Sequence, residues 1–417
     1  MPVSPTYPGV YVEEIPSGVR TIVGVATAIT AFVGRALRGP VNEPTLINNY
    51  SDYERQFGGL WLKSPLSFAV RDFYLNGGSQ ALIIRVYKPE DQGTGVASNQ
   101  IGDLTLQAVS PGAWGNKLRL KADQDNIPDA IVAQYGLTKS DFFNLTVTDN
   151  GTGQVERYLN LTTADTPLRV DRVLADSSSL VSWQGAWPAQ TPKVPKSTDS
   201  DKLGQAEQAV ATARNKLTQA QSDYATALAN ANGDTTAGPV VAAKTALDAA
   251  KAALDTANTA YATAESGLGG KDGVAPTSTE YTMGYQTLDT VDVFNLLCLT
   301  PYALDTDVDP TLIGNAAAYC ESMHAFLIVD APHDWKDANT AKGKFLDTNI
   351  DFVGTRSNHA GIFYPRLRQQ NPLHNNQVEV FVPCGAVAGV FSRTDVQRGV
   401  WKAPAGLDAT LNNVVGL

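Results

Sequence analysis

The sequence is poor in the residues from which proteins build metal centres and disulfide frameworks. It contains 3 cysteines, 3 methionines and 4 histidines among 417 residues. Each cysteine stands in an apolar setting, and their odd number favours buried, reduced thiols and a cytoplasmic location over disulfide bonds. Neither the cysteines nor the histidines show the spacing of a zinc site. We therefore expect no metal site and no cofactor.

Excess basic charge and long apolar runs are also missing. The 42 acidic residues outnumber the 32 basic ones, which gives a formal net charge of −10. This balance disfavours binding to nucleic acid or to an anionic membrane surface. No stretch approaches ~18 consecutive apolar residues, and the N-terminus does not resemble a secretion signal. We expect a folded protein of two or three domains, with no nucleic-acid partner and no membrane insertion.

Two separated stretches of the sequence alternate between strand and helix patterns. This alternation is typical of an α/β core, a mostly parallel sheet with covering helices, and we expect residues 20–90 and 282–417 to share that sheet. Ser51 and Glu54 have the spacing of a capping box at the start of the first helix. Buried strands are expected at 29–34, 81–87, 293–299, 325–330 and 360–364, and helices at 51–58, from Ser64–Pro65 to Asn76, after Asp309–Pro310 and at 338–346.

The stretch between the two core segments has a different character. Alternating strand patterns around an Asn-Gly turn at residues 150–151 predict an inserted β-rich module. An Ala-rich segment with almost no large side chains follows it. The predicted domains are a linking arm at 1–19, the first part of the core at 20–95, the β-rich module at 96–198, an antiparallel coiled-coil hairpin at 199–272 and the second part of the core at 273–417.

The Ala-rich segment carries two runs of large residues spaced seven apart, each followed three positions later by alanine. Large a and small d positions in this register predict a close-packed helical hairpin. At 1.5 Å per residue each arm is roughly 40 Å long, so the hairpin should project from the core. An Ala-rich disordered linker is the alternative. The predicted packing residues are Leu203, Val210, Leu217, Tyr224, Val240, Leu247, Leu254 and Tyr261.

The N-terminus is an extended segment punctuated by prolines, which exclude a stable helix. The run that follows Gly9 has the β-branched and aromatic content of a strand. It can pair locally with residues 19–25, or it can add to the sheet edge of a neighbouring molecule. A donated strand would suit a protein that forms filaments. The candidate inter-subunit strand comprises Val10, Tyr11, Val12, Glu13, Glu14 and Ile15.

An enzymatic hypothesis starts at Asp330, at the carboxyl end of a predicted buried strand where α/β sheets place ligands. His333 follows three residues later, and an Asp–His pair can act as a general base. These two residues define the alternative function, an α/β hydrolase-like enzyme. No nucleophile accompanies them, and Asp330 can equally cap the turn after its strand. A basic group around Trp401, formed by residues 393, 398 and 402, can bind an acidic partner or simply face solvent.

Several segments, taken together, resemble contractile tail sheath proteins. The PGVYVEE start combined with RGVWKAPA near the end is hard to reach by chance, and the resemblance covers most of the sequence except the Ala-rich hairpin. The segments are residues 7–14, 29–35, 39–40, 51–58, 73–78, 110–116, 389–395 and 398–405.

The resemblance implies a structural protein of a phage tail or of a related bacterial contractile injection system, without an active site. Copies would stack helically around an inner tube, and contraction would drive the tube through a target membrane. The implied partners are other sheath subunits, the inner tube protein, and baseplate and terminator proteins, within a tail-like particle that is a virion if the machine is a phage. A baseplate or terminator adaptor that shares the sheath core is an alternative.

The resemblance also gives roles to individual segments. In the family the N-terminal arm joins neighbouring subunits by strand addition, and that role carries over to Val10–Ile15. The β-rich module and the hairpin would lie on the outer surface. Family members continue beyond the segment that matches residues 406–417, so this sequence is expected to lack their C-terminal portion.

Overall fold

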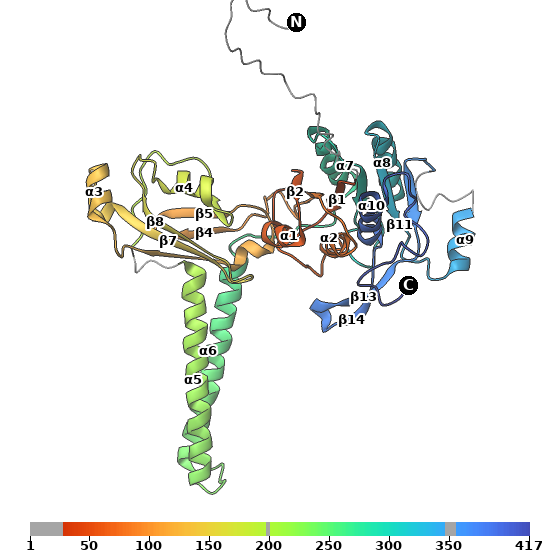
Figure 1. Cartoon of the computed structure of the whole chain (residues 1–417). Coiled ribbons are helices and arrows are strands. Elements are labelled where there is room, and N and C mark those ends of the chain that lie inside the picture. The colour runs from red at the N-terminus through yellow and green to blue at the C-terminus, as the bar shows by residue number, and fades with distance from the viewer. Residues whose placement is uncertain (1–27, 197–200, 347–355) are drawn as a thin grey trace, which may run out of the picture.

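The computed structural model describes residues 28–196, 201–346 and 356–417, and a six-stranded sheet forms its core (Figure 1). The strand order is β12-β11-β10-β1-β3-β2, and every neighbouring pair is parallel except β2 with β3. The predicted parallel sheet shared by two distant segments is thus confirmed. The strands are β1 (Thr30–Gly34), β2 (Thr45–Ile47), β3 (Ala81–Arg85), β10 (Leu296–Leu299), β11 (Phe326–Asp330) and β12 (Ala360–Phe363).

Helices cover both faces of this sheet. Successive side chains of a strand point to opposite faces, and the strands carry apolar side chains on both. Phe32 and Ile83 pack with α1, α2 and α10 on one face, whereas Val33 and Ile84 pack with α7 and α8 on the other. Both faces are therefore apolar, as expected for buried parallel strands. The helices of the core are α1 (Tyr50–Phe57), α2 (Leu66–Leu75), α7 (Ser278–Gln286), α8 (Pro310–Ser322), α9 (Ala338–Leu346) and α10 (Cys384–Arg398).

The first helix does not begin at the predicted capping box. Its N-cap is Asn49, whose Oδ1 accepts a hydrogen bond from the Asp52 backbone N–H at 2.8 Å, so the prediction of Ser51 as the cap is wrong. Asparagine caps as well as serine does, and the earlier start brings Tyr50 into the helix. There its ring stacks on that of Tyr53, with centroids 5.7 Å apart.

The β-rich module consists of two three-stranded antiparallel sheets, β4-β5-β9 and β6-β7-β8. Its apolar core is separate from that of the six-stranded sheet. The elements are β4 (Ser98–Ile101), β5 (Leu104–Ala108), β6 (Leu118–Asp123), α3 (Asp129–Tyr135), β7 (Phe142–Asp149), β8 (Val155–Thr162), α4 (Val170–Ser177) and β9 (Val181–Trp183).

Two 29-residue helices, α5 (Lys202–Asn230) and α6 (Gly238–Ser266), pack side by side and project from the β-rich module (Figure 1). Val240 and Leu247 are buried in the hairpin, Leu203 is buried in the core of the β-rich module, and the remaining large residues of the two heptad runs are half-buried. Most other positions are exposed. The hairpin therefore has a narrow apolar seam and a wide surface in contact with solvent.

The last part of the chain contains elements for which the sequence analysis made no prediction. The strands β13 (Leu367–Asn371) and β14 (Gln377–Phe381) form an antiparallel ribbon, and Gly416 forms a further bridge to Arg368. Helix α10 follows the ribbon and packs on α2. Short 3-10 helices occupy Ala113–Lys117, Lys139–Asp141, Thr287–Thr290 and Pro372–His374. Among the described residues, no helix combines the length and apolarity needed to cross a membrane.

Candidate functional site

The predicted inter-subunit strand, Val10–Ile15, lies outside the residues that the structure describes. Most of the other sheath-like segments lie within them and meet at two places. We name these the α2–α10 seam, formed by residues 69–77 with 385–393, and the core–module seam, formed by residues 35–39 and 85 with 110–112 and 149.

At the α2–α10 seam the two helices approach so closely that only glycine fits. A Cβ atom added to Gly385 would lie 1.9 Å from the carbonyl oxygen of Ala69, and one added to Gly389 would lie 2.5 Å from that of Phe73. Both distances are well inside van der Waals contact with backbone atoms that cannot rotate away. The spacing of four residues places both glycines on one helix face. That spacing is the sequence signal for this contact, which the predicted elements did not include.

A polar network attaches the end of the chain to the same seam. The carboxylate of Asp72, a fully buried residue of α2, accepts hydrogen bonds from Gln369 Nε2 at 2.8 Å and Asn413 Nδ2 at 3.4 Å. Asn76 Oδ1 accepts the backbone N–H of Asn412 at 2.7 Å. Burial raises the pKa of Asp72 to about 6. Residues 412–413 are thus held against α2 by buried polar groups, which favour one docked position over others.

At the core–module seam a buried arginine joins two loops. Arg85, at the end of β3, is 2% exposed, and its guanidinium donates to the carbonyl oxygens of Ala36 at 3.1 Å, Gly39 at 2.8 Å and Pro111 at 2.7 Å. Burial lowers its pKa to about 10. The Gly39 backbone N–H donates to Ser110 Oγ at 3.0 Å. Residues 39–40 and 110–111, two of the sheath-like segments, therefore meet through Arg85.

Two further arginines strengthen this seam. Arg38, in the loop after β1, forms an ion pair at 3.2 Å with Asp149 of β7. Their side chains are only 7% and 3% exposed. The guanidinium of Arg35 lies over the rings of Trp61 and Tyr302 of the core, 4.8 and 4.2 Å from their centroids. It also donates to the carbonyl oxygen of Asp272 at 3.2 Å, and the Asp272 carboxylate accepts the backbone N–H of Ala113 at 2.8 Å. Because a buried ion pair is costly to separate, we infer that this seam fixes the module against the core.

The hairpin is anchored to the β-rich module at its base. Asp201 Oδ2 accepts the backbone N–H of Leu120 at 2.5 Å, next to the first turn of α5. Arg119 of β6 pairs with Glu207 of α5 at 2.7 Å and donates to the hydroxyl of Tyr261 of α6 at 3.2 Å. The hydrogen bond from Arg119 lowers the pKa of Glu207. One strand of the module therefore holds both helices of the hairpin.

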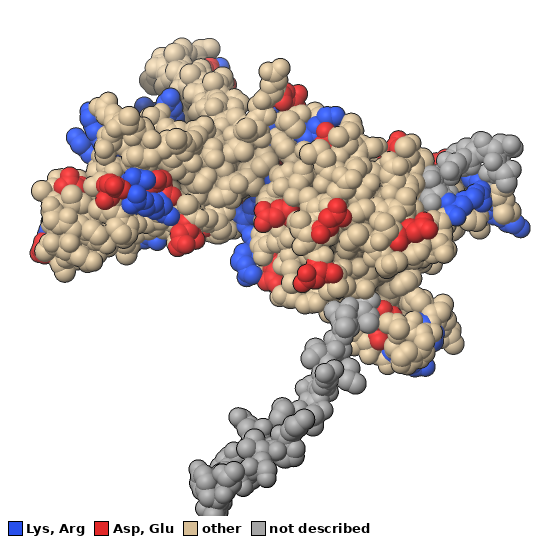
Figure 2. Space-filling view, turned by 90° about the horizontal axis from the view of Figure 1, so that it is seen from above, with Lys and Arg blue, Asp and Glu red and all other residues tan. Residues whose placement is uncertain are grey.

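The basic group around Trp401 is largely used within the chain. Arg393 donates to the Thr410 carbonyl oxygen at 2.6 Å, Arg398 lies 3.8 Å from Asp408, and Lys402 donates to the carbonyl oxygens of its own loop. Trp401 itself is 85% exposed. The face shown in Figure 2 carries small, separate groups of acidic and basic side chains within a larger uncharged surface. That distribution differs from the continuous basic band typical of nucleic-acid binding.

The structure does not assemble the Asp–His pair of the alternative enzymatic hypothesis. Asp330 Oδ1 accepts the backbone N–H of Cys384 at 2.7 Å, while the backbone N–H of His333, an exposed residue, donates to Asp307 at 2.8 Å. In the parts of the chain that the structure describes, no hydrogen bond joins Asp330 to His333. The carboxylate therefore positions the start of α10 and does not orient an imidazole, so the proposed general base is not formed.

The described residues were also compared with the requirements of a metal site and of a reactive thiol. Within residues 28–196, 201–346 and 356–417, no group of histidine, cysteine, aspartate and glutamate side chains is arranged to hold a metal ion. Cys298, Cys320 and Cys384 are buried and free, as predicted from their apolar settings. Burial raises the pKa of the Cys298 and Cys320 thiols, the latter to about 12, so neither is a reactive thiolate near neutral pH.

Comparisons with known proteins give similar solved structures but no sequence family. No protein-family model matches the sequence, and no curated protein matches it. Among solved structures, the chain is similar to a sheath tail protein from Listeria innocua, with a TM-score of 0.46 and 13% identity over 89% of this chain and 57% of the other.

The chain is also similar to two further solved structures. A sheath tail protein from Desulfitobacterium hafniense has a TM-score of 0.43 and 11% identity, over 93% of this chain and 62% of the other. The helical sheath of the anti-feeding prophage in its contracted state has a TM-score of 0.36 and 15% identity, over 99% of this chain and 58% of the other. The chain thus spans 57 to 62% of the length of these proteins.

Proposed function

We propose that this chain is a structural subunit of a contractile sheath, in a phage tail or a related injection machine. The observation that carries the proposal is that the sheath-like segments are also the segments that contact one another. Residues 73–78 pack against 389–395 at the α2–α10 seam, and residues 39–40 meet 110–111 at the core–module seam. We expect the segments that resemble sheath proteins to form their common structural core, and segments of a core pack against one another.

The work of such a subunit is conformational. Copies of the chain would stack around an inner tube, between baseplate and terminator proteins, in a tail-like particle assembled in the cytoplasm. The strand Val10–Ile15 would add to a neighbouring copy, and at about 1 kcal/mol net per hydrogen bond it would supply a link of several kcal/mol. Such a link can hold neighbours together while their larger interfaces slide during contraction.

The hairpin and the β-rich module fit an outward position in this assembly. The module is attached to the core through the Arg85 and Arg38 contacts, and the hairpin extends from the module away from the core (Figure 1). A long projection with mostly exposed sides would obstruct packing around an inner tube. We therefore place α5 and α6 on the outer surface of the particle.

Electron microscopy of the purified chain tests the proposal directly. At high protein concentration, negative-stain images should show tubes or stacked rings. Dispersed globular particles across the same concentration range would contradict an assembling sheath subunit. A single ring bound to the end of a tail, without growth along the shaft, would indicate an adaptor instead.

The arm is tested by substitutions at Val12. Changing Val12→Pro removes the backbone N–H needed for strand addition, whereas the matched Val12→Thr variant keeps both that N–H and a β-branched side chain. We expect Val12→Pro, like deletion of residues 2–15, to abolish assembly while leaving thermal unfolding unchanged. Val12→Thr should assemble normally. Equal assembly of all three variants would exclude a role for this strand.

A further inference from the structure

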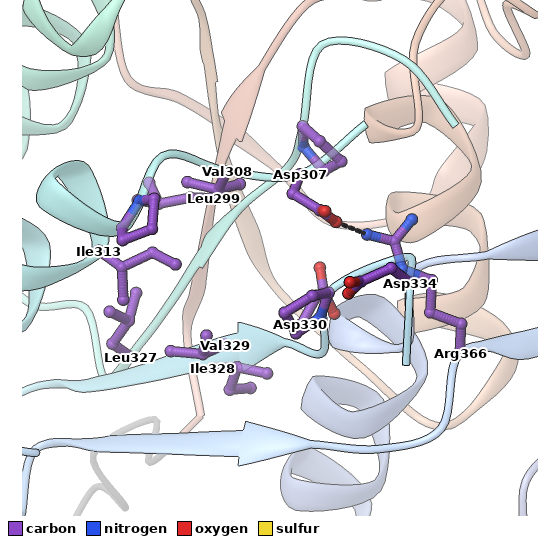
Figure 3. A pocket seen from close by; sticks show the side chains of 13 residues that line it. Leu299, Asp307, Val308, Ile313, Leu327, Ile328, Val329, Asp330, Asp334 and Arg366 are labelled. Carbon is purple, nitrogen blue, oxygen red and sulfur yellow. Dashed lines mark hydrogen bonds and ion pairs between the residues drawn. The ribbon is translucent and has the colours of Figure 1, made fainter. Parts of the chain in front are cut away.

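A pocket of about 290 Å³ opens at the carboxyl ends of β10 and β11 (Figure 3). Its walls come from those two strands, from the loop before α8 and from the first turn of α8. Most of the lining is apolar, and charged side chains gather at one end. The apolar lining consists of Leu299, Pro301, Val308, Pro310, Ile313, Leu327, Ile328, Val329 and Pro332.

The single basic residue that lines this pocket is already committed to loop contacts. Arg366 donates to the carbonyl oxygens of Ala331, Leu304 and Thr306 at 3.0, 3.0 and 3.1 Å. It also pairs with Asp307 at 2.5 Å (Figure 3). These contacts use four of the five N–H donors of the guanidinium and connect the loops around the pocket. Arg366 therefore forms part of the wall, and its contacts go to Ala331, Leu304, Thr306 and Asp307 instead of Asp330.

The acidic side chains of the pocket differ in whether they have a partner. Asp307 pairs with Arg366, and Asp334 pairs with Lys344. Asp330 has no basic partner. Its Oδ1 accepts the Cys384 backbone N–H and the Cys384 thiol contacts the carboxylate, while the buried Oδ2 accepts no N–H or O–H hydrogen bond among the described residues. A buried carboxylate oxygen without a donor is costly, so this atom is unusual for a folded protein.

We propose that this pocket binds an alkylammonium group, an apolar chain of about four carbons that ends in a primary ammonium, as in a lysine side chain. The alkyl chain lies along the walls formed by Leu299, Val308 and Ile313. The ammonium forms a direct ion pair with the Asp330 carboxylate, which makes none with the described side chains of the pocket. A neutral ligand of the same shape would fill the walls but leave that charge unpaired. The inference is independent of the sheath proposal.

Protonation of Asp330 gives the site a pH dependence. Burial raises the pKa of Asp330 to about 6, while the Cys384 contact and the positive charge of Arg366 oppose that rise and Asp307 adds to it. The remaining charged group that lines the pocket is Asp334, paired with Lys344. The carboxylate is therefore ionised above about pH 6, and an ammonium should bind more tightly at pH 7.5 than at pH 5.

The test is a titration of the full chain with n-pentylammonium, followed by calorimetry or by chemical shifts of the pocket residues. We expect saturable binding in the millimolar range, with Asp330→Asn weakening it about tenfold or more. Asparagine keeps the acceptor for Cys384, so this variant should fold. The matched control Asp334→Asn, which changes a paired carboxylate of the same pocket, should alter the affinity less than twofold. Equal affinity of Asp330→Asn and the wild-type chain would overturn the proposal.

Two further ligands sharpen the result. n-Pentanol has the same shape without the charge and should bind at least tenfold more weakly than n-pentylammonium at pH 7.5. Equal binding of the two would show a purely apolar pocket and would also overturn the proposal. Nα-acetyl-lysine methylamide separates the sources of the ammonium. Binding like that of n-pentylammonium indicates a lysine side chain of another copy, and weaker binding indicates a free small amine.

Discussion

The six-stranded core and the α5–α6 hairpin bury their apolar residues in different ways. In the core, each face of the sheet packs large side chains against helices, and α10 approaches α2 to the limit set by Gly385. In the hairpin, a few large residues alternate with alanines, and most of the surface is exposed. The core therefore depends on close contacts between distant segments, whereas the hairpin depends on a local repeat and on anchors at its base.

This difference fits two different tasks. A core that must keep its shape while subunits move benefits from packing that tolerates no alternatives, because closely packed interiors do not deform continuously. A projecting hairpin has no such demand beyond its base. We therefore expect substitutions in the core to have large effects on the whole chain and substitutions in the hairpin to have smaller, local ones.

The largest effect is expected at the α2–α10 seam. Gly385→Ala should lower the free energy of unfolding by about 3 kcal/mol, because the added Cβ would overlap the backbone of Ala69. The matched control is Gly343→Ala on α9, where an added Cβ meets nothing within 4 Å. Alanine should stabilise that helix by up to about 1 kcal/mol. Urea denaturation measures both, and equal effects of the two variants would contradict the close contact.

A smaller effect should come from the pH dependence of Asp72 in the core. Because the pKa of buried Asp72 is raised to about 6, the folded chain binds more protons than the unfolded chain between about pH 4 and 6. The contribution of Asp72 to stability is present at low pH and is lost as pH rises through about 6. The free energy of unfolding of the Asp72→Asn variant should therefore rise by about 2 kcal/mol relative to that of the wild-type chain between pH 4 and 7.

The control for this pH effect lies on the hairpin. The side chain of Asp248 is 54% exposed. The difference in unfolding free energy between Asp248→Asn and the wild-type chain should therefore vary by less than about 0.5 kcal/mol between pH 4 and 7. Denaturation curves at pH 4, 5, 6 and 7 give both differences. If the difference in unfolding free energy between Asp72→Asn and the wild-type chain stays constant with pH, this carboxylate does not titrate in the range inferred from its burial.

The smallest global effect is expected in the hairpin itself. Leu247→Ala should destabilise α5 and α6 by about 2 kcal/mol, because Leu247 is 9% exposed and packs between the two helices. Hydrogen exchange should accelerate in the hairpin and stay unchanged in the six-stranded sheet. Lys216→Ala, at an exposed position of α5, should be neutral within about 0.5 kcal/mol. Faster exchange in the sheet of Leu247→Ala would mean that the hairpin and the core unfold together.

The sequence was most informative where a structural signal is local. The strands around Phe32, Ile83 and Leu327 were predicted from short buried runs, and Asp309 was correctly expected at the start of α8, where its side chain caps the helix. The first helix shows the limit of local signals, because Asn49 and Ser51 are both good caps. Tertiary packing of Tyr50 favoured the earlier start.

The unpredicted elements are those whose stability comes from distant partners. Helix α10 has weak amphipathic character in its sequence, since glycine and alanine fill the face that contacts α2. The ribbon of β13 and β14 carries exposed valines and polar residues at buried positions such as Gln369, whose partner is Asp72. Patterns of this kind do not indicate burial until the partner segment is known.

Sequence alone therefore determined the α/β alternation, the seven-residue repeat of the hairpin and the family resemblance, because each depends on residues close together in the chain. Only the tertiary structure decided which distant segments meet. It placed Gly385 against Ala69, enclosed Arg85 between three carbonyl oxygens and left one oxygen of Asp330 without an N–H or O–H donor beside a pocket. The physical reason is that burial and pairing of these groups depend on contacts made across the whole fold, which no local pattern records.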